Sequence, residues 1–447
     1  MKSHLKRVYN FCSNYAIACM IIIDVLFFIF VVGYISHVDI IEFDFGWVEC
    51  MKANGFTSIY HMVDGNVVSN INYPPMYPFA LYLLKDFITS SHSHVTQVCL
   101  MAFPVIMFIV SQIYFYKCVS KNVALAWTFC LPFLFNVFIW GQRDAAFAFF
   151  LILMFINIEK HNLYRTVFWF TMLCLLKPQG SLLLPVLFLY LIIENKKIKD
   201  KLLSLVMGCM IGLVAFLPFI IEERSLKTFL VPYLYAGGDM IRINMYAPNI
   251  WCLFCGASFP EELEFIPLVT IVLSMLLLFV VYGQTKNIVC SSFIYLFLQF
   301  MFTFHQTERY SLYSFTLLFF ICFISVDKYK FVKYKICYYL QFIVCFIIQL
   351  VVYIKSTVPY IIFARLYPGK CLYDMPQAEL NTFEKPFTEM LHSSDEIAAV
   401  LYVAFVASIL LTALMLYIMV FIFKDLGWVN NKQKKIVKEN CVENSER

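Results

Sequence analysis

Two charged residues, Arg143 and Asp144, stand between two long apolar runs, in the stretch Trp140-Gly-Gln-Arg-Asp. Charged side chains at that depth are expensive to bury, so they mark a ligand site or pair with each other. Asp144 could orient an acceptor hydroxyl or hold a cation, and Arg143 could bind phosphate through its fork of N–H donors. The alternative is an Arg–Asp pair that closes a helix turn.

Two further carboxylates follow the first apolar run. Asp39 stands where that run ends, and Asp44 comes five residues later. A carboxylate at the edge of a membrane can lose part of its hydration and gain the basicity of a proton acceptor. The alternative for Asp39 is an interfacial carboxylate that caps the next helix. The stretch Asn72-Tyr-Pro-Pro then predicts a rigid, extended turn with aromatic anchors, because proline restricts itself and its predecessor.

Later polar segments add cations. Lys177, in Lys-Pro-Gln-Gly, suits a lipid-linked phosphate at membrane depth, or its long side chain extends to the surface instead. In the stretch His305-Gln-Thr-Glu-Arg-Tyr, Arg309 can bind phosphate through two N–H groups and Glu308 can hold Arg309 in place. His305 is a weaker candidate for a catalytic role, because a lone histidine is more often structural than catalytic.

Two other features stay open at this point. The polar and aromatic stretch from Arg242 to Trp251 either packs on a sugar ring or re-enters the membrane. Asp24 lies inside the first apolar run, where a carboxylate is either paired within the helix bundle or functional.

Composition defines the elements that must position these residues. With 62% hydrophobic residues, 48 Phe and 14% charged residues, the chain is a polytopic membrane protein and not a soluble domain. Helix is the spanning solution for such apolar runs, so the expected fold class is all-α. We expect about twelve transmembrane helices, near 16–37, 96–116, 122–139, 145–158, 166–176, 181–194, 202–221, 265–283, 288–303, 311–326, 336–355 and 397–423. The short runs at 166–176 and 181–194 are expected to pair as a hairpin.

Charge orients this arrangement, because cytoplasmic loops collect Lys and Arg. Alternate loops and the two ends of the chain carry 22 of the 34 basic residues, which predicts cytoplasmic termini in a multi-pass plasma membrane protein, or an endoplasmic reticulum protein in a eukaryote. The opposite, extracytoplasmic side then holds the long loops 38–95, 222–264 and 356–396. It also holds the short loops Gly141–Asp144, Lys177–Gly180 and His305–Arg309. The candidate residues therefore share one side of the membrane.

Taken in order, these stretches resemble the GT-C superfamily of polyprenyl-phosphate-sugar-dependent glycosyltransferases, in particular bacterial relatives of the second mannosyltransferase of GPI-anchor synthesis. The resemblance covers roughly residues 39–310. It rests on Asp39 followed eight residues later by Trp47, on Asn72-Tyr-Pro-Pro, Trp140-Gly-Gln-Xaa-Asp144 and Lys177-Pro-Gln179, on the stretch Asn244 to Trp251, and on Glu308-Arg309-Tyr310. The chain departs from the common pattern at Gln306-Thr, where relatives often have Met-His, and at Ile40, where Tyr is common.

The resemblance implies a GT-C module over residues 1–326, a variable transmembrane module over 327–423 and a cytoplasmic tail over 424–447. It implies an inverting transfer, metal-independent or loosely metal-assisted, with Asp39 as general base and Asp44 as the second choice. Lys177 and Arg309, with Arg143 as a third candidate, would hold the donor phosphate. Substrate contacts are expected from Trp47, Tyr73, Gln142, Asp144, Gln179, Asn249, His305, Glu308 and Tyr310.

The expected activity is transfer of a hexose, mannose first, from a polyprenyl-phosphate donor to a lipid-linked or cell-envelope glycan acceptor. A lipid-linked donor needs no nucleotide site, and the sequence has no P-loop or dinucleotide fingerprint. It also has no Cys/His cluster of zinc spacing, and no cofactor or nucleic-acid partner is expected. Two alternatives are an O-antigen or exopolysaccharide polymerase and a flippase of lipid-linked oligosaccharides. The flippase is disfavoured because the charges cluster at one face and not at the midplane of many helices.

Overall fold

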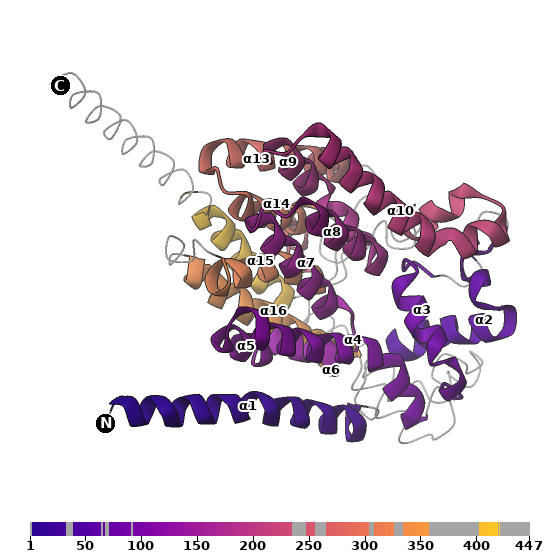
Figure 1. Cartoon of the computed structure of the whole chain (residues 1–447), viewed down its shortest axis with the longest axis horizontal. Coiled ribbons are helices and arrows are strands. Elements are labelled where there is room, and N and C mark those ends of the chain that lie inside the picture. Colours follow the sequence, from indigo (N-terminus) through magenta and orange to yellow (C-terminus); the bar gives the residue numbers. More distant parts are fainter. Residues whose placement is uncertain are drawn as a thin grey trace.

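A computed structural model describes residues 2–32, 39–63, 66–67, 71–90, 93–234, 247–254, 265–303, 308–325, 334–356, 402–418 and 420. The described chain is helical apart from one short antiparallel pair, β1 (Met62–Val63) with β2 (Asn66–Val67), in the register Met62↔Val67. Figure 1 shows a bundle of helices, with α1 (Lys2–Phe30) at one edge. The predictions for residues 357–401 and 421–447, which include most of the loop 356–396 and the whole tail, lie outside the described residues, as does the predicted module boundary after residue 326.

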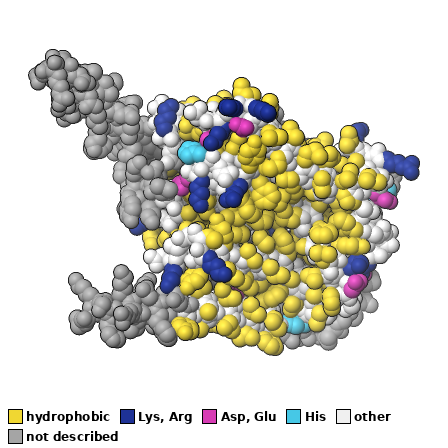
Figure 2. All heavy atoms as spheres, in the orientation of Figure 1, with side chains coloured by type: hydrophobic (Ala, Val, Ile, Leu, Met, Phe, Trp, Pro, Cys, Tyr) yellow, Lys and Arg dark blue, Asp and Glu magenta, His cyan; other side chains and the backbone are white. Residues whose placement is uncertain are grey.

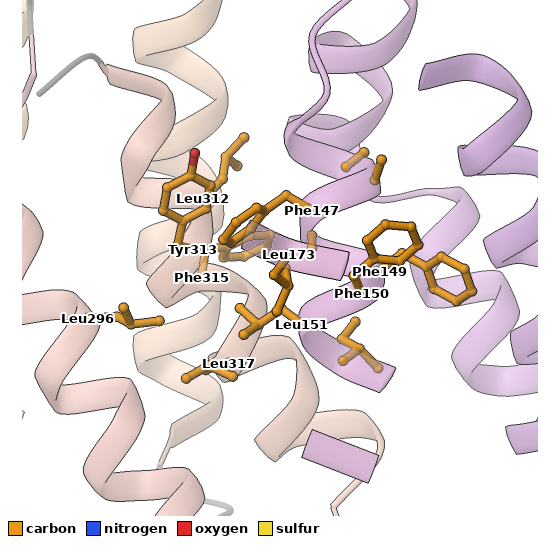
Figure 3. Packing of buried hydrophobic residues seen from close by; sticks show 14 of the residues in the cluster. Phe147, Phe149, Phe150, Leu151, Leu173, Leu296, Leu312, Tyr313, Phe315 and Leu317 are labelled. Atoms are coloured by element: carbon orange, nitrogen blue, oxygen red, sulfur yellow. The ribbon is translucent and has the colours of Figure 1, made fainter. Parts of the chain in front are cut away.

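The core of the bundle is α7 (Asp144–Glu159), which contacts α4, α6, α8 and α15. Every residue of α7 before Glu159 is buried, because the helix is apolar on all sides and other helices surround it. Next to it, α15 (Ser311–Phe323) is buried from Ser311 to Cys322, and α14 (Ile288–Phe302) packs against α15. Figure 3 shows how side chains of these helices meet; the rings of Phe147 and Tyr313 lie 4.5 Å apart.

One side of α7 is covered by the first helices of the bundle. They are α4 (His94–Tyr114), which continues as the π-helical turn η5 (Phe115–Val119), and the pair α5 (Lys121–Thr128) and α6 (Leu131–Phe138). The pair bends by 56° between its two helices. Pro132 in the first turn of α6 explains the break, because proline cannot donate the hydrogen bond that would continue α5.

The remaining long helices surround this core. They are α8 (Leu163–Leu176), the 3₁₀ turn η6 (Pro178–Leu183), α9 (Leu184–Ile193), α10 (Ile198–Glu223), α13 (Phe265–Thr285), α16 (Tyr334–Ser356) and a last apolar helix, Tyr402–Ile418. Many Leu, Ile, Val and Phe side chains of α9, α10 and α13 are exposed. In Figure 2 hydrophobic side chains cover the middle of the molecule, while Lys and Arg lie mostly toward the side on which α1 begins. Such a surface suits lipid and not water.

A smaller group of elements packs at the end of the bundle where α7 begins. It comprises the π-helical turn η2 (Ile40–Phe45), α2 (Gly46–Asn54), the 3₁₀ turn η3 (Phe56–Tyr60), α3 (Met76–Leu83) and the 3₁₀ turn η4 (Lys85–Phe87). Aromatic contacts join it to α10, for example Tyr60 to Phe219 at 4.8 Å. Further along the chain lie η7 (Leu226–Leu230), α11 (Val231–Leu234), α12 (Ile250–Phe254) and η10 (Glu308–Tyr310).

The prediction of an all-helical membrane protein is confirmed. A helix lies over each of the twelve predicted apolar segments, although its ends differ by several residues in places. Within the described residues, three helices are long and apolar enough to cross a membrane: His94–Val119, Ile198–Glu223 and Tyr334–Ile354. The bent pair of α5 and α6 makes a fourth if it counts as one span. The expected hairpin forms only at its tip, where η6 packs on α8; beyond the tip α8 lies chiefly along α7 and α10 and touches α9 little.

Candidate active site

Four charged side chains meet where α7 begins. Asp44 comes from η2, Arg143 and Asp144 from the turn into α7, and Lys177 from the residue before η6. All four are at most 3% exposed. The sequence predicted each of them as a site residue, and the fold brings together groups that are up to 133 positions apart, from Asp44 to Lys177.

Arg143 and Asp144 do not pair with each other, so the predicted alternative of a local Arg–Asp pair is wrong. Arg143 Nη2 forms an ion pair with Asp44 Oδ1. The Tyr77 hydroxyl donates to Asp44 Oδ2 at 2.7 Å, and the guanidinium of Arg143 lies 3.7 Å from the centre of the Tyr77 ring. Arg143 is thus held by a carboxylate and by an aromatic face, both buried.

Electrostatics in this part of the site are governed by burial. Burial raises the pKa of Asp44 to about 6, because the loss of hydration outweighs the attraction of Arg143 and the hydrogen bond from Tyr77. Burial also holds the pKa of Tyr77 well above its usual value, so its hydroxyl stays protonated and donates to Asp44. At neutral pH the pair of Asp44 and Arg143 is therefore ionised.

A second buried ion pair forms around Asp144. Lys177 Nζ lies 2.6 Å from Asp144 Oδ1, which also accepts a hydrogen bond from the Tyr313 hydroxyl at 3.0 Å. Asn136 Nδ2 donates to the other oxygen, Oδ2, at 3.2 Å. Lys177 is 3% exposed, so the alternative in which its side chain extends to the surface is wrong. Its ammonium group also lies 5.7 Å from the ring centre of Tyr310.

Asp39 is more open than these pairs. Its side chain is 25% exposed, and its Oδ2 lies 3.5 Å from Arg309 Nη1, whose side chain is 16% exposed. Gln142 Nε2 donates to the same oxygen at 3.3 Å. Asp39 precedes η2 but accepts no capping hydrogen bond from it, so the predicted role as a helix cap is wrong.

Gln142 joins the buried and the open parts of the site. Its Oε1 accepts a hydrogen bond from Arg143 Nη1 at 3.2 Å, while its Nε2 donates to Asp39. A continuous chain of polar contacts therefore runs from Asp44 through Arg143 and Gln142 to Asp39 and on to Arg309. Such a chain fixes the position of the Asp39 carboxylate relative to the buried ion pair.

Two glycines explain how the chain delivers these residues. Gly141 has a φ of 60°, and a Cβ there would lie 2.7 Å from Ile40 Cδ1 and 2.9 Å from Met101 Cγ. Any other residue would be strained at this φ and would have to displace the Ile40 and Met101 side chains, so glycine suits the turn that places Gln142 and Arg143 against η2. At Gly180 a Cβ would lie 2.5 Å from the backbone of Leu173, so glycine lets η6 pack closely on α8 and brings Lys177 to the site.

The aromatic and amide residues predicted as substrate contacts are divided between the site and the surrounding fold. Gln179 Nε2 donates to the Tyr310 hydroxyl at 2.8 Å, and the rings of Trp47 and Tyr73 lie 5.5 Å apart beside Arg143. Asn249 serves a structural purpose: its side chain accepts hydrogen bonds from the first turn of α12 and donates to the Thr303 carbonyl. His305 and the side chain of Glu308 lie outside the described residues.

The structure adds site residues that sequence reasoning missed. Tyr77 follows Tyr73 by four positions and Tyr313 follows Tyr310 by three, and each lies beside that predicted residue, with ring centres 5.8 Å and 5.6 Å apart. No pattern in the sequence marked Asn136 as a site residue. Outside the site, Asp24 accepts a hydrogen bond from Gln112 Nε2 at 2.8 Å, which supplies the partner that the sequence did not reveal.

Carboxylates of this site have basic partners, and no group of three or more His, Cys, Asp or Glu side chains that could hold a metal ion occurs among the described residues. What the site offers chemically is a partly exposed carboxylate beside a guanidinium, supported by two neutralised ion pairs.

No protein-family model matches the chain, and a search of curated proteins finds no match. Fold and site together define the class as an all-helical membrane protein with a charged, buried site at one end of its bundle.

Proposed function

We propose that the protein is a membrane glycosyltransferase of the GT-C type. It transfers a hexose, mannose first, from a polyprenyl-phosphate donor to a lipid-linked or cell-envelope glycan acceptor on the extracytoplasmic side. The observation that carries the proposal is the contact between a partly exposed carboxylate, Asp39, and a partly exposed guanidinium, Arg309, at 3.5 Å. A displacement at an anomeric carbon needs a base for the acceptor and a cation for the leaving phosphate, and this pair supplies both.

In the proposed reaction Asp39 takes the proton of the acceptor hydroxyl as its oxygen attacks the anomeric carbon. The bond between that carbon and the phosphate oxygen breaks, and its electron pair leaves with the polyprenyl phosphate. The anomeric configuration inverts in this single displacement. Arg309 stabilises the charge that grows on the departing phosphate, since guanidinium binds phosphate through two parallel N–H groups.

Asp39 is a better candidate for the base than Asp44. Asp44 is 1% exposed and engaged by Arg143 and Tyr77, whereas the Asp39 side chain is 25% exposed. A general base must come within hydrogen-bond reach of the hydroxyl that it deprotonates, and a buried carboxylate cannot do so without moving. The same reasoning ranks Arg309 above Arg143 and Lys177 as the phosphate ligand, because both of these cations are buried against carboxylates.

The two buried ion pairs then act as supports. The six charged groups are three carboxylates (Asp39, Asp44, Asp144) and three cations (Arg143, Lys177, Arg309), so their formal charges cancel. At the pair of Asp144 and Lys177, removal of one partner leaves an uncompensated buried charge, which costs about 3–5 kcal/mol. Gln142 and Arg143 are therefore positioning residues that hold Asp39, and Lys177 and Asp144 hold the turn into α7 beside η6.

The proposed architecture has twelve helices that span the membrane. The helices over the predicted apolar segments support it, and the basic loops support termini on the cytoplasmic side. In this arrangement α7 begins at the extracytoplasmic face, where its first turn carries the site.

The test is a transfer assay with purified protein in liposomes. Radiolabelled polyprenyl-phosphate-mannose and nucleotide-linked mannose are offered separately with lipid and glycan acceptors. The proposal predicts addition of one sugar from the lipid-linked donor alone, and a much weaker use of that donor by Arg309→Gln. Transfer from the nucleotide sugar would refute the donor class, and long-chain products from preassembled lipid-linked repeats would favour a polymerase.

A further inference from the structure

A cavity of about 440 Å³ lies at the far end of α7 from the candidate active site. It is formed by the turn after α7, the end of α9 and the turn between α13 and α14. Its lining is mixed: apolar side chains such as Ile193 and Ile288 face the same space as the charged Glu159, Glu194 and Lys286. The volume is within the range of small-ligand sites.

The first turn of α14 lines this cavity, and three other helices end at it. They are α7, α9 and α13, and each helix C-terminus carries a partial negative charge. Glu159 and Glu194 add carboxylates at the ends of α7 and α9. The ends of α7 and α9 therefore favour the positive group of a ligand, while Lys286 and the start of α14 favour a negative group.

The rim of the cavity carries basic residues in strained conformations. His161 and Lys286 both have a φ of 52°, a left-handed conformation that usually falls to glycine just after a helix. A residue other than glycine is disfavoured in this conformation, so its presence marks a position that the surrounding structure enforces. Lys286 is exposed, and it offers a cation to the negative part of a ligand.

The deepest polar groups of the cavity are Glu194 and Tyr190. The Glu194 side chain is 5% exposed, and its partner, His161 Nδ1 at 2.9 Å, lies on a ring that is 74% exposed. The Tyr190 hydroxyl is buried and lacks a hydrogen bond of normal geometry, although Glu194 and Thr166 are its polar neighbours. A group with several N–H donors would bind to this carboxylate and this hydroxyl together.

We propose that the cavity binds a phosphoethanolamine group, with its ammonium on Glu194 and Tyr190 and its phosphate on Lys286. The source that fits best is the headgroup of a phospholipid. The cavity lies at the end of apolar helices, where headgroups lie, and two of these helices expose apolar side chains to lipid: Ile192 on α9 and Val280 on α13 are each 57% exposed. This site is separate from the proposed transfer reaction, and it faces the leaflet that the basic loops assign to the cytoplasm.

The experiment is native mass spectrometry on the full-length protein in detergent. The protein is delipidated and offered an equimolar mixture of phosphatidylethanolamine, phosphatidylcholine and phosphatidylglycerol. The proposal predicts retention of phosphatidylethanolamine about tenfold above phosphatidylcholine, whose trimethylated nitrogen has no N–H donor. Equal retention of the three lipids would overturn it. Binding of soluble phosphoethanolamine as tight as that of the lipid would overturn the lipid as the source.

Variants identify the site. Glu194→Gln and the milder Tyr190→Phe should each lower retention of phosphatidylethanolamine several-fold, about tenfold for the carboxylate, because a hydrogen bond to a charged group is lost. Asp200→Asn is the matched control, since it removes a carboxylate near the start of α10 that does not line the cavity. Unchanged retention in Tyr190→Phe and Lys286→Gln, both of which leave Glu194 in place, would overturn the proposal even if Glu194→Gln failed to fold.

Discussion

The buried pair of Asp144 and Lys177 allows a test that does not depend on the activity. Lys177→Met removes the ammonium group and leaves Asp144, which is 0% exposed, with hydrogen bonds from Tyr313 and Asn136 only. Breaking a buried pair from one side costs about 3–5 kcal/mol, because one charge stays buried without compensation. Asp144→Asn should cost a similar amount, since Lys177 is then the uncompensated charge.

The double variant distinguishes this explanation from a loss of packing. If the cost comes from the unpaired charge, removing both charges should destabilise by at least about 2 kcal/mol less than the sum of the single variants. The assay is reversible unfolding in mixed micelles with increasing denaturing detergent, and Lys199→Met is the control because Lys199 is exposed. Single variants no worse than this control, or strictly additive costs, would refute the reasoning.

Three further predictions concern the rest of the site. Gln142→Leu should lower the rate of transfer about tenfold or more. It should also shift the acid limb of the pH–rate profile to higher pH, because the carboxylate of Asp39 loses a hydrogen bond that favours its ionised form. An unshifted limb would mean that Gln142 contributes only packing. Gly141→Ala should destabilise the folded protein by about 1–3 kcal/mol and weaken transfer, since its Cβ meets Ile40 and Met101 at a φ of 60°. Unfolding in micelles measures the first effect and the transfer assay measures the second. A neutral result would mean that the turn relaxes. Protonation of Asp44 should stabilise the folded protein as the pH falls from about 6 to about 4, because the folded-state pKa of about 6 exceeds the ordinary value. The thermal midpoint of the wild type should therefore rise relative to that of Asp44→Asn over this range. Parallel midpoints would contradict the raised pKa.

The helices were predictable from the sequence because their signal is local. Long apolar runs form helices inside a membrane, and a helix lies over the described part of each of the twelve predicted segments. Their packing was not predictable in the same way. The runs at 166–176 and 181–194 are neighbours in the chain, yet α8 packs along α7 and α10, because the contact partners depend on the whole bundle.

The members of the site were also largely predictable, and their pairing was not. Arg143 and Asp144 were expected to bind a ligand or to pair with each other, but adjacent residues point in different directions as a helix begins. Each therefore found a partner on another segment, Asp44 for Arg143 and Lys177 for Asp144. Partners without charge, such as Asn136, carried no pattern that sequence reasoning could use.

The measurement that tests the central claim most directly is sugar transfer by Asp39→Asn in the liposome assay, with Glu49→Gln as a control for an exposed carboxylate on the neighbouring α2. If Asp39 accepts the proton of the acceptor, the variant should fold as the wild type does and lose transfer from polyprenyl-phosphate-mannose by about a hundredfold or more, while Glu49→Gln keeps it. Transfer by Asp39→Asn at the rate of the control would contradict the account.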